Sequence, residues 1–184
     1  MAVPGEWHPE RYRDLLCMLA RQVQLSPRLR RRFDASDLVQ ETLLKATENL
    51  EQFRGGTEAE LVKWLEEIMQ NALADAIRRA RAQKRDVARE DALAVVVNDS
   101  SVRLRNWLVA PDSSPSQRAQ REEQLLRVAA ALAKLPEDQR DVVILRDSLD
   151  TPIRAIAEQL GRTEKAIAGL LLRGRRKLRD LLQE

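Results

Sequence analysis

The segment "TPIRAIAEQLGRTEKAIAGLLLRGRRKLRDLL", residues 151–182, limits the fold of this chain more than any other stretch. Its apolar residues recur at helical intervals, which predicts two amphipathic helices. Thr151 is expected to cap the first helix, with Pro152 at its first helical position. Gly161 then permits a tight turn, and Thr163 caps the second helix. Two short helices joined by such a turn form a helix-turn-helix.

The second of these helices has a basic outer face. Its apolar stripe consists of Ile167, Leu170, Leu171, Gly174, Leu178, Leu181 and Leu182. The cations that fall mostly on the other side are Lys165, Arg173, Arg176 and Arg179. In the major groove such cations reach phosphates or guanine edges, Gly169 allows close backbone approach, and Leu172 can contact a thymine methyl. A membrane surface, a partner's groove and plain bundle packing are the alternatives, but the basic face and the turn length favour duplex DNA.

The rest of the chain is also predicted to be helical. Only 3% of the 184 residues are aromatic and β-branched runs are nearly absent, whereas Ala, Leu, Arg, Glu and Gln dominate and favour helices. Helical patterns cover residues 9–24, 35–50, 58–85, 118–135, 137–148, 152–160 and 164–182. The stretch around Trp107 is rich in Ser, Asp, Asn and Pro, as linkers are. We therefore predict an all-α protein with two small helical domains, residues 1–97 and 118–184, joined by a flexible linker at 98–117.

Composition excludes several functional classes. Cys17 is the only cysteine and lies in the apolar context "LLCML", which indicates a buried thiol and argues against a disulfide or a cysteine-based zinc site. His8 is the only histidine, and there is neither a Walker-type segment nor a nucleophile beside a base, so we expect no enzyme activity, no cofactor and no metal. There is no export leader and no apolar run that would span a bilayer, so we expect a cytoplasmic protein without membrane insertion. The net charge is only +3, so any nucleic-acid surface must come from local clusters.

The predicted helix at 35–50 has an acidic outer face. Asp34 can cap its N-terminus, and the expected buried stripe consists of Val39, Leu43, Ala46 and Leu50. The residues left on the outer face are Asp37, Gln40, Glu41, Leu44 and Glu48. An acidic face repels DNA and suits a protein partner, although many such faces are only solvated.

The predicted helix at 58–85 separates an apolar face from an amide-rich and cationic face. The residues expected to pack inward are Leu61, Trp64, Leu65, Ile68 and Ala72. Those on the far side are Lys63, Gln70, Asn71, Arg78, Arg81 and Arg85, which could read bases and hold a nucleic-acid backbone. The preceding loop "EQFRGG" offers Phe53 and Arg54 and could cradle an unstacked base, or it could be a simple connector.

Together these residues resemble a known family. The segments that carry the resemblance are "DASDLVQETLLKA", "FRGG", "WLEEIMQNALADAIRR" and "LAKLPEDQRDVVILRDSLDTPIRAIAEQLGRTEKAIAGLLLRGRRKLRDLL". In this order and spacing they are similar to the extracytoplasmic-function (ECF) group of bacterial sigma factors. The match covers most of the chain outside the linker, and two separate signatures make it specific.

The resemblance implies three binding surfaces. The "DLVQE" helix of the family binds the clamp of core RNA polymerase, which here implies a role for Asp37, Leu38, Gln40 and Glu41. The loop and the next helix bind and melt the promoter minus-10 element, which implies Phe53, Arg54, Trp64, Gln70, Asn71, Arg78 and Arg79. The helix-turn-helix reads the minus-35 element in duplex DNA, which implies Thr163, Lys165, Gly169, Leu172, Arg173, Arg176 and Arg179. The resemblance also admits an anti-sigma factor or another inhibitory partner.

Two alternative functions would require less of the chain. A stand-alone helix-turn-helix regulator needs only the C-terminal residues and a dimer interface, and it leaves residues 34–86 without a task. A helical adaptor without a DNA role would bind a partner and fail to bind DNA at any salt concentration. A sigma factor that directs promoter recognition and transcription initiation accounts for both the acidic and the basic faces.

Overall fold

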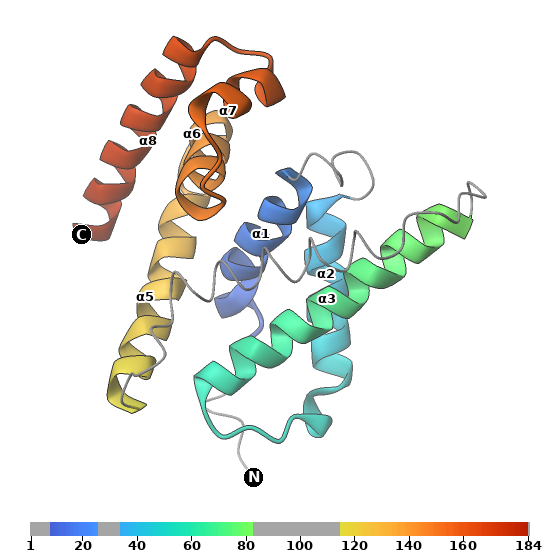
Figure 1. Cartoon of the computed structure of the whole chain (residues 1–184). Helices are drawn as coiled ribbons and strands as arrows, with labels where there is room; N and C mark the ends of the chain where they lie inside the picture. Colours follow the sequence, from blue (N-terminus) through green and yellow to red (C-terminus); the bar gives the residue numbers. More distant parts are fainter. Residues whose placement is uncertain (1–7, 26–33, 83–114, 184) are drawn as a thin grey trace.

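The computed structural model describes residues 8–25, 34–82 and 115–183, and these residues form helices and turns without a strand (Figure 1). The elements are α1 (Glu10–Leu25), α2 (Ala35–Glu48), the 3₁₀ turn η1 (Leu50–Gln52), α3 (Glu58–Ala82), α5 (Pro115–Ala133), α6 (Glu137–Val143), the π turn η2 (Ile144–Ser148), α7 (Ile153–Leu160) and α8 (Glu164–Gln183). The prediction of an all-α protein is confirmed. Helix α5 begins at Pro115, inside the segment predicted as a linker, and Trp107 lies outside the described residues.

The N-terminal bundle consists of α1, α2 and α3. Helix α2 packs against both of its neighbours, and the buried side chains come mainly from leucines at helical spacing. Asp34 caps α2 as predicted, since its Oδ1 accepts a bond of 2.7 Å from the Ser36 N–H. Thr42 is fully buried, and its hydroxyl is satisfied by donating to the Leu38 carbonyl at 2.7 Å. Leu50, predicted to be buried, is only half-buried because α2 ends at Glu48.

The C-terminal bundle consists of α5, α6, η2, α7 and α8, and it contains the predicted helix-turn-helix. Gly161 ends α7 in the left-handed conformation, with φ 64° and ψ 38°, which costs glycine little and other residues more. The Thr163 hydroxyl then accepts from the Ala166 N–H at 3.2 Å and caps α8. The apolar stripe of α8 lies on the side that packs on α5, α6 and α7, with Ile167, Leu170, Leu171 and Gly174 buried and Leu178, Leu181 and Leu182 half-buried.

One local prediction in this bundle was wrong. Thr151 does not cap α7, because Pro152 itself takes the cap position with an extended ψ of 144° and the helix begins at Ile153. The Thr151 N–H instead bonds to the Leu145 carbonyl at 2.9 Å. The helix predicted at 137–148 is regular only to Val143 and continues as the π turn η2, whose wider spacing is seen in the bond from the Leu149 N–H to the Ile144 carbonyl.

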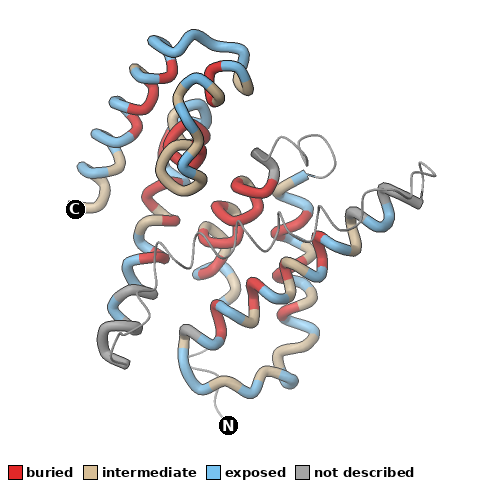
Figure 2. The backbone as a smooth tube through the Cα atoms, in the orientation of Figure 1, coloured by how far each residue is buried: buried red, intermediate tan, exposed pale blue. Residues whose placement is uncertain are grey.

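The two bundles pack on each other. Helix α1 lies along α5 and also meets η2, and buried residues line their facing sides (Figure 2). Leu15 and Leu19 of α1 belong to the same apolar cluster as Leu132 and Ile144 of the C-terminal bundle. The described helices therefore share one core, and the C-terminal bundle is docked on α1.

Candidate functional site

The outer face of α2 is open to solvent. Asp37, Gln40 and Glu48 are exposed, and Leu44 is 60% exposed, which is unusual for a large apolar side chain in this structure. The predicted acidic face therefore exists, with an apolar residue among its polar ones. Such a mixture is typical of a surface that meets another protein.

Leu38, assigned to this face by the family resemblance, does not lie on it. Its side chain is only 3% exposed and belongs to the core of the N-terminal bundle. Val39 beside it is buried as well, so the buried stripe of α2 is wider than the spacing of Val39, Leu43 and Ala46 predicts. In this structure Leu38 packs in the core and supports α2 from within the bundle.

Glu41 is half-buried and joins α2 to α3 through a chain of ion pairs. Its carboxylate accepts from Lys45 Nζ at 3.0 Å and from Arg79 Nη2 at 3.1 and 3.0 Å. Lys45 Nζ also contacts Asp75 Oδ2 at 3.2 Å, and Arg78 pairs with the other oxygen of Asp75. Burial works against the charged form of Glu41, but the bonds from Lys45 and Arg79 outweigh it and lower its pKa. These five residues are the α2–α3 network.

An aromatic pair joins the loop before α3 to the helix, with Phe53 in the loop and Trp64 on α3. The rings of Phe53 and Trp64 lie with their centroids 5.4 Å apart at 44°, and both side chains are half-buried. This is a favourable aromatic geometry, and it leaves part of each ring open to solvent. Arg54 beside them is exposed and donates to the Glu51 carbonyl at 2.8 Å.

Gly55 and a capping box fix the position of this loop. A Cβ on Gly55 would lie 2.3 Å from Phe53 Cζ and 2.8 Å from Glu60 Cβ, so only glycine fits between them. The Glu60 carboxylate accepts from the Gly56 and Thr57 N–H groups at 2.8 and 3.1 Å, and the Thr57 hydroxyl accepts from the Glu60 N–H at 3.3 Å. The sequence analysis missed this box, although "TEAE" carries its threonine and glutamate at the required spacing.

Helix α3 presents the predicted polar residues unevenly. Asn71, Arg78 and Arg79 are exposed, whereas Gln70 is half-buried. Both arginines belong to the α2–α3 network, where Arg78 pairs with Asp75 and Arg79 with Glu41. The side chain of Arg81 and the whole of Arg85 lie outside the described residues.

The outer face of α8 carries the predicted cations. Lys165, Arg173, Arg176 and Arg179 are exposed, and none of them has an ion-pair partner within the described residues. Leu172 is 72% exposed between them. Thr163 is exposed at the helix start, and Gly169 is half-buried where the Arg173 guanidinium folds back over it, 3.3 Å from where a Cβ would lie.

Other cations near the helix-turn-helix hold the bundle together. Arg175 of α8 donates from Nε to Asp147 of η2 at 3.0 Å, and this bond raises its pKa despite partial burial. Arg162 in the turn pairs with Asp138 of α6 at 2.6 Å. The sequence alone does not separate Arg175 from Arg173 and Arg176, because all three lie in one basic run of α8.

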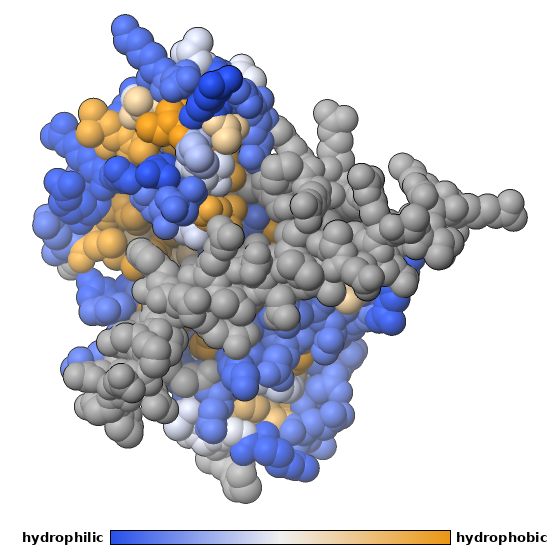
Figure 3. All heavy atoms as spheres, in the orientation of Figure 1, coloured by the Kyte–Doolittle hydropathy of each residue, from blue (hydrophilic) through white to orange (hydrophobic). Residues whose placement is uncertain are grey.

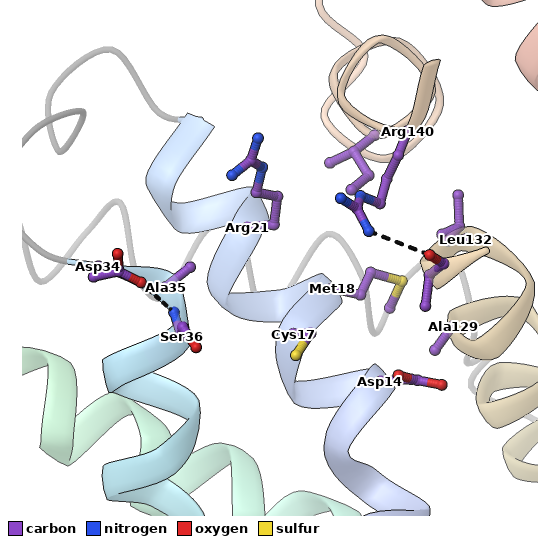
Figure 4. Close-up of a pocket in the computed structure, with 12 residues that line it drawn as sticks. Asp14, Cys17, Met18, Arg21, Asp34, Ala35, Ser36, Ala129, Leu132 and Arg140 are labelled. Carbon is purple, nitrogen blue, oxygen red and sulfur yellow. Dashed lines mark hydrogen bonds between the residues drawn. The ribbon is translucent and has the colours of Figure 1, made fainter. Parts of the chain in front are cut away.

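A cavity of about 280 Å³ opens where α1, the start of α2, α5 and α6 meet (Figure 4). Cys17 lies on its wall and is half-buried rather than buried as predicted, and burial raises the pKa of its thiol.

Within the described ranges no group of three or more His, Cys, Asp or Glu is placed to hold a metal ion. Apolar residues gather on the face of the C-terminal bundle seen in Figure 3, yet none of the described helices is long and apolar enough to cross a membrane.

Comparison with protein-family models divides the chain as the two bundles do. Residues 10–83 match Sigma-70 region 2, and residues 125–178 match Sigma-70, region 4. The ECF RNA polymerase sigma factor EcfG of Rhodopseudomonas palustris (strain TIE-1) is 33% identical over 148 residues, which span 80% of this chain and 71% of that protein.

The chain belongs to the ECF RNA polymerase sigma factors.

The present chain spans less than half the length of a second relative. The ECF RNA polymerase sigma factor SigG of Mycobacterium tuberculosis (strain ATCC 25618 / H37Rv) is 35% identical over 159 residues, which span 80% of this chain and 42% of that protein. Among solved structures, the sigma factor RpoE in complex with the anti-sigma factor NepR from Bartonella quintana is 22% identical, with 95% of this chain and 94% of that chain covered and a TM-score of 0.35.

The two matches cover nearly all predicted site residues of this ECF sigma factor. Region 2 takes in α1 to α3, with both the outer face of α2 and the aromatic pair. Region 4 includes the helix-turn-helix as far as Leu178, so Arg179 lies one residue beyond the match.

Proposed function

We propose that this ECF sigma factor binds core RNA polymerase and directs it to promoters, where it recognises two DNA elements and supports initiation of transcription. One observation carries the proposal. A single chain presents an acidic face on α2, amides and arginines along α3, and a separate cationic face on α8. A stand-alone regulator would bind DNA through α8 alone, and the outer face of α2 would then have no function.

The outer face of α2 is the proposed docking surface for polymerase. Asp37 and Gln40 are exposed, and the Glu41 carboxylate lies beside them with its charge favoured by its cationic neighbours. Leu44 adds an apolar contact on the same face, and buried Leu38 supports the helix from below. Acidic groups around one apolar residue suit a basic partner surface, because charge steers the encounter and the apolar contact adds affinity.

The loop and α3 form the proposed minus-10 surface. The half-exposed rings of Phe53 and Trp64 can stack on an unpaired base, since any base has a face that stacks on an aromatic ring. The other groups of the proposed surface are Arg54 in the loop and, further along α3, Gln70, Asn71, Arg78 and Arg79. The wall of this surface is rigid where Gly55 and Glu60 fix the loop.

Helix α8 is the proposed minus-35 reader. Its exposed cations are arranged for phosphates and guanine edges, and Leu172 is placed to touch a thymine methyl. We retain the division into residues 1–97, a linker at 98–117 and residues 118–184 as part of the proposal, with action in the cytoplasm where the polymerase works. An anti-sigma factor or another inhibitory partner remains a prediction of the family resemblance.

Co-purification with core polymerase tests the docking surface. The variant Asp37→Lys/Gln40→Lys replaces an exposed aspartate and an exposed glutamine three residues apart on α2. The matched control, Asp180→Lys/Gln183→Lys, makes the same two exchanges at the same spacing on exposed positions of α8. We expect the α2 variant to lose co-purification and the control to keep it, with both folded by circular dichroism. Equal retention by both variants would remove α2 from the docking surface.

A further inference from the structure

Arg79 belongs to the proposed minus-10 surface and Glu41 to the proposed polymerase surface, and in this structure they neutralise each other. Arg79 Nη2 lies 3.1 and 3.0 Å from the two carboxylate oxygens of Glu41, across 38 residues of sequence. The Arg79 Nε is also held, since it donates to the Asp75 carbonyl at 3.3 Å. The guanidinium therefore lies toward α2 in the free protein.

The ion pair between Glu41 and Arg79 can break easily. The Arg79 side chain is 64% exposed, and ion pairs at such exposure are weak and exchange readily with other partners. Glu41 does not depend on Arg79 alone, because Lys45 remains beside it at 3.0 Å. Lys45 is in turn shared with Asp75, so the α2–α3 network keeps a partner for each carboxylate when Arg79 leaves.

We propose that the Glu41–Arg79 ion pair couples polymerase docking to DNA binding. In the free protein Glu41 competes with nucleic-acid phosphates for Arg79. A basic polymerase surface that engages Glu41 takes over the carboxylate and releases Arg79 to the melted strand. Each binding event then favours the other, as thermodynamic linkage requires. This inference rests on the proposed function, because it needs both surfaces in use.

Binding of single-stranded DNA by the free full-length protein tests the restraint without polymerase. The probe is a fluorescein-labelled single strand of mixed sequence at low salt, read by anisotropy, since phosphate contacts do not depend on sequence. Glu41→Gln removes the charge and keeps the shape. The matched control is Glu48→Gln, which removes the same charge from an exposed position on the same helix.

We expect Glu41→Gln to tighten binding by about two- to fivefold, the range set by an exposed ion pair, and Glu48→Gln to change it by much less. In an Arg79→Gln background the same Glu41→Gln exchange should give no more than the control. Equal effects of the two glutamate variants, persistence of the gain without Arg79, or no measurable binding by any variant would each overturn the coupling. Circular dichroism confirms that every variant is folded.

These outcomes are separable from a failure of the proposed function. If the wild-type chain does not co-purify with polymerase while Glu41→Gln still tightens DNA binding through Arg79, the polymerase role fails and only the restraint of Arg79 stands. If co-purification succeeds and the Glu41→Gln gain is absent, the coupling fails and the sigma-factor role stands.

Discussion

Arg21 on α1 donates to both carboxylate oxygens of Asp141 on α6, from Nε at 2.8 Å and from Nη2 at 2.7 Å. The two residues are 120 positions apart and join the N-terminal bundle to the C-terminal one. Asp141 is only 8% exposed, and the planar guanidinium of Arg21 satisfies both of its carboxylate oxygens. The bond to Asp141 is the main reason that the pKa of Arg21 is raised, against the effect of burial.

Replacing Arg21 should therefore loosen the docking of the C-terminal bundle on α1. Arg21→Ala leaves the buried Asp141 carboxylate unpaired, and we expect the free energy of unfolding to fall by about 1–3 kcal/mol, less than for a fully buried pair because Arg21 reaches solvent. Urea unfolding measures this change, and small-angle scattering should show a larger radius of gyration. Arg13→Ala, which breaks the exposed pair with Glu10, is the control and should leave both quantities nearly unchanged.

The loop before α3 can be tested with neighbouring glycines. An alanine Cβ at Gly55 would overlap the Phe53 ring, whereas one at Gly56 would meet no atom within 4 Å. Gly55→Ala should push Phe53 away from Trp64, lower the melting temperature and weaken binding of single-stranded DNA. Gly56→Ala should leave the melting temperature and the binding essentially at the wild-type level. If the two variants melt and bind alike, the close fit around Gly55 has no part in shaping this surface.

Two neighbouring arginines of α8 should separate DNA contact from structural support. Arg176 is exposed, and Arg175 is committed to Asp147. Arg176→Ala should weaken binding to duplex DNA and reduce the slope of log affinity against log salt by about one. Arg175→Ala should lower stability and leave that slope unchanged. The same loss of slope in both variants would contradict the assignment of Arg175 to the fold.

The α2–α3 network predicts a stability change in acid. The pKa of Glu41 is lowered from 4.5 in the folded state, so its ion pairs stabilise the protein above that value and are lost as the pH falls through the lower folded pKa. Wild type should therefore exceed Glu41→Gln in free energy of unfolding near neutral pH, and the difference should narrow as the pH falls below 4.5 and through the lowered folded pKa. A difference that stays constant over that range would show that the charge of Glu41 contributes nothing to folding.

Local patterns predicted the helices and much of the helix-turn-helix. Gly161 and Thr163 act within a few residues of themselves, so their roles as turn and cap can be inferred from the sequence. The prediction that Thr151 caps α7 was wrong because the backbone at Pro152 is extended. Helical spacing carries no signal for the π turn after Val143. Such details depend on packing around the bend rather than on propensity.

The candidate surfaces were predictable in outline and not in detail. Asp37 and Gln40 lie outward as the spacing of α2 indicates, but Leu38 is buried because the core takes a wider stripe than one residue per turn. The pairing of Glu41 with Arg79, and the structural role of Arg21, join residues far apart in sequence. No single-sequence pattern reports which of many arginines meets which carboxylate.

Reconstituted transcription shows whether the chain directs core RNA polymerase to promoters. Core RNA polymerase is mixed with a library of promoter fragments, with and without the purified full-length chain, and run-off transcripts are sequenced to find their start sites. We predict that specific start sites appear only when the chain is present and disappear with Asp37→Lys/Gln40→Lys, while the Asp180→Lys/Gln183→Lys control still supports initiation. The account is contradicted if the chain protects DNA sites by itself but adds no start site to core polymerase.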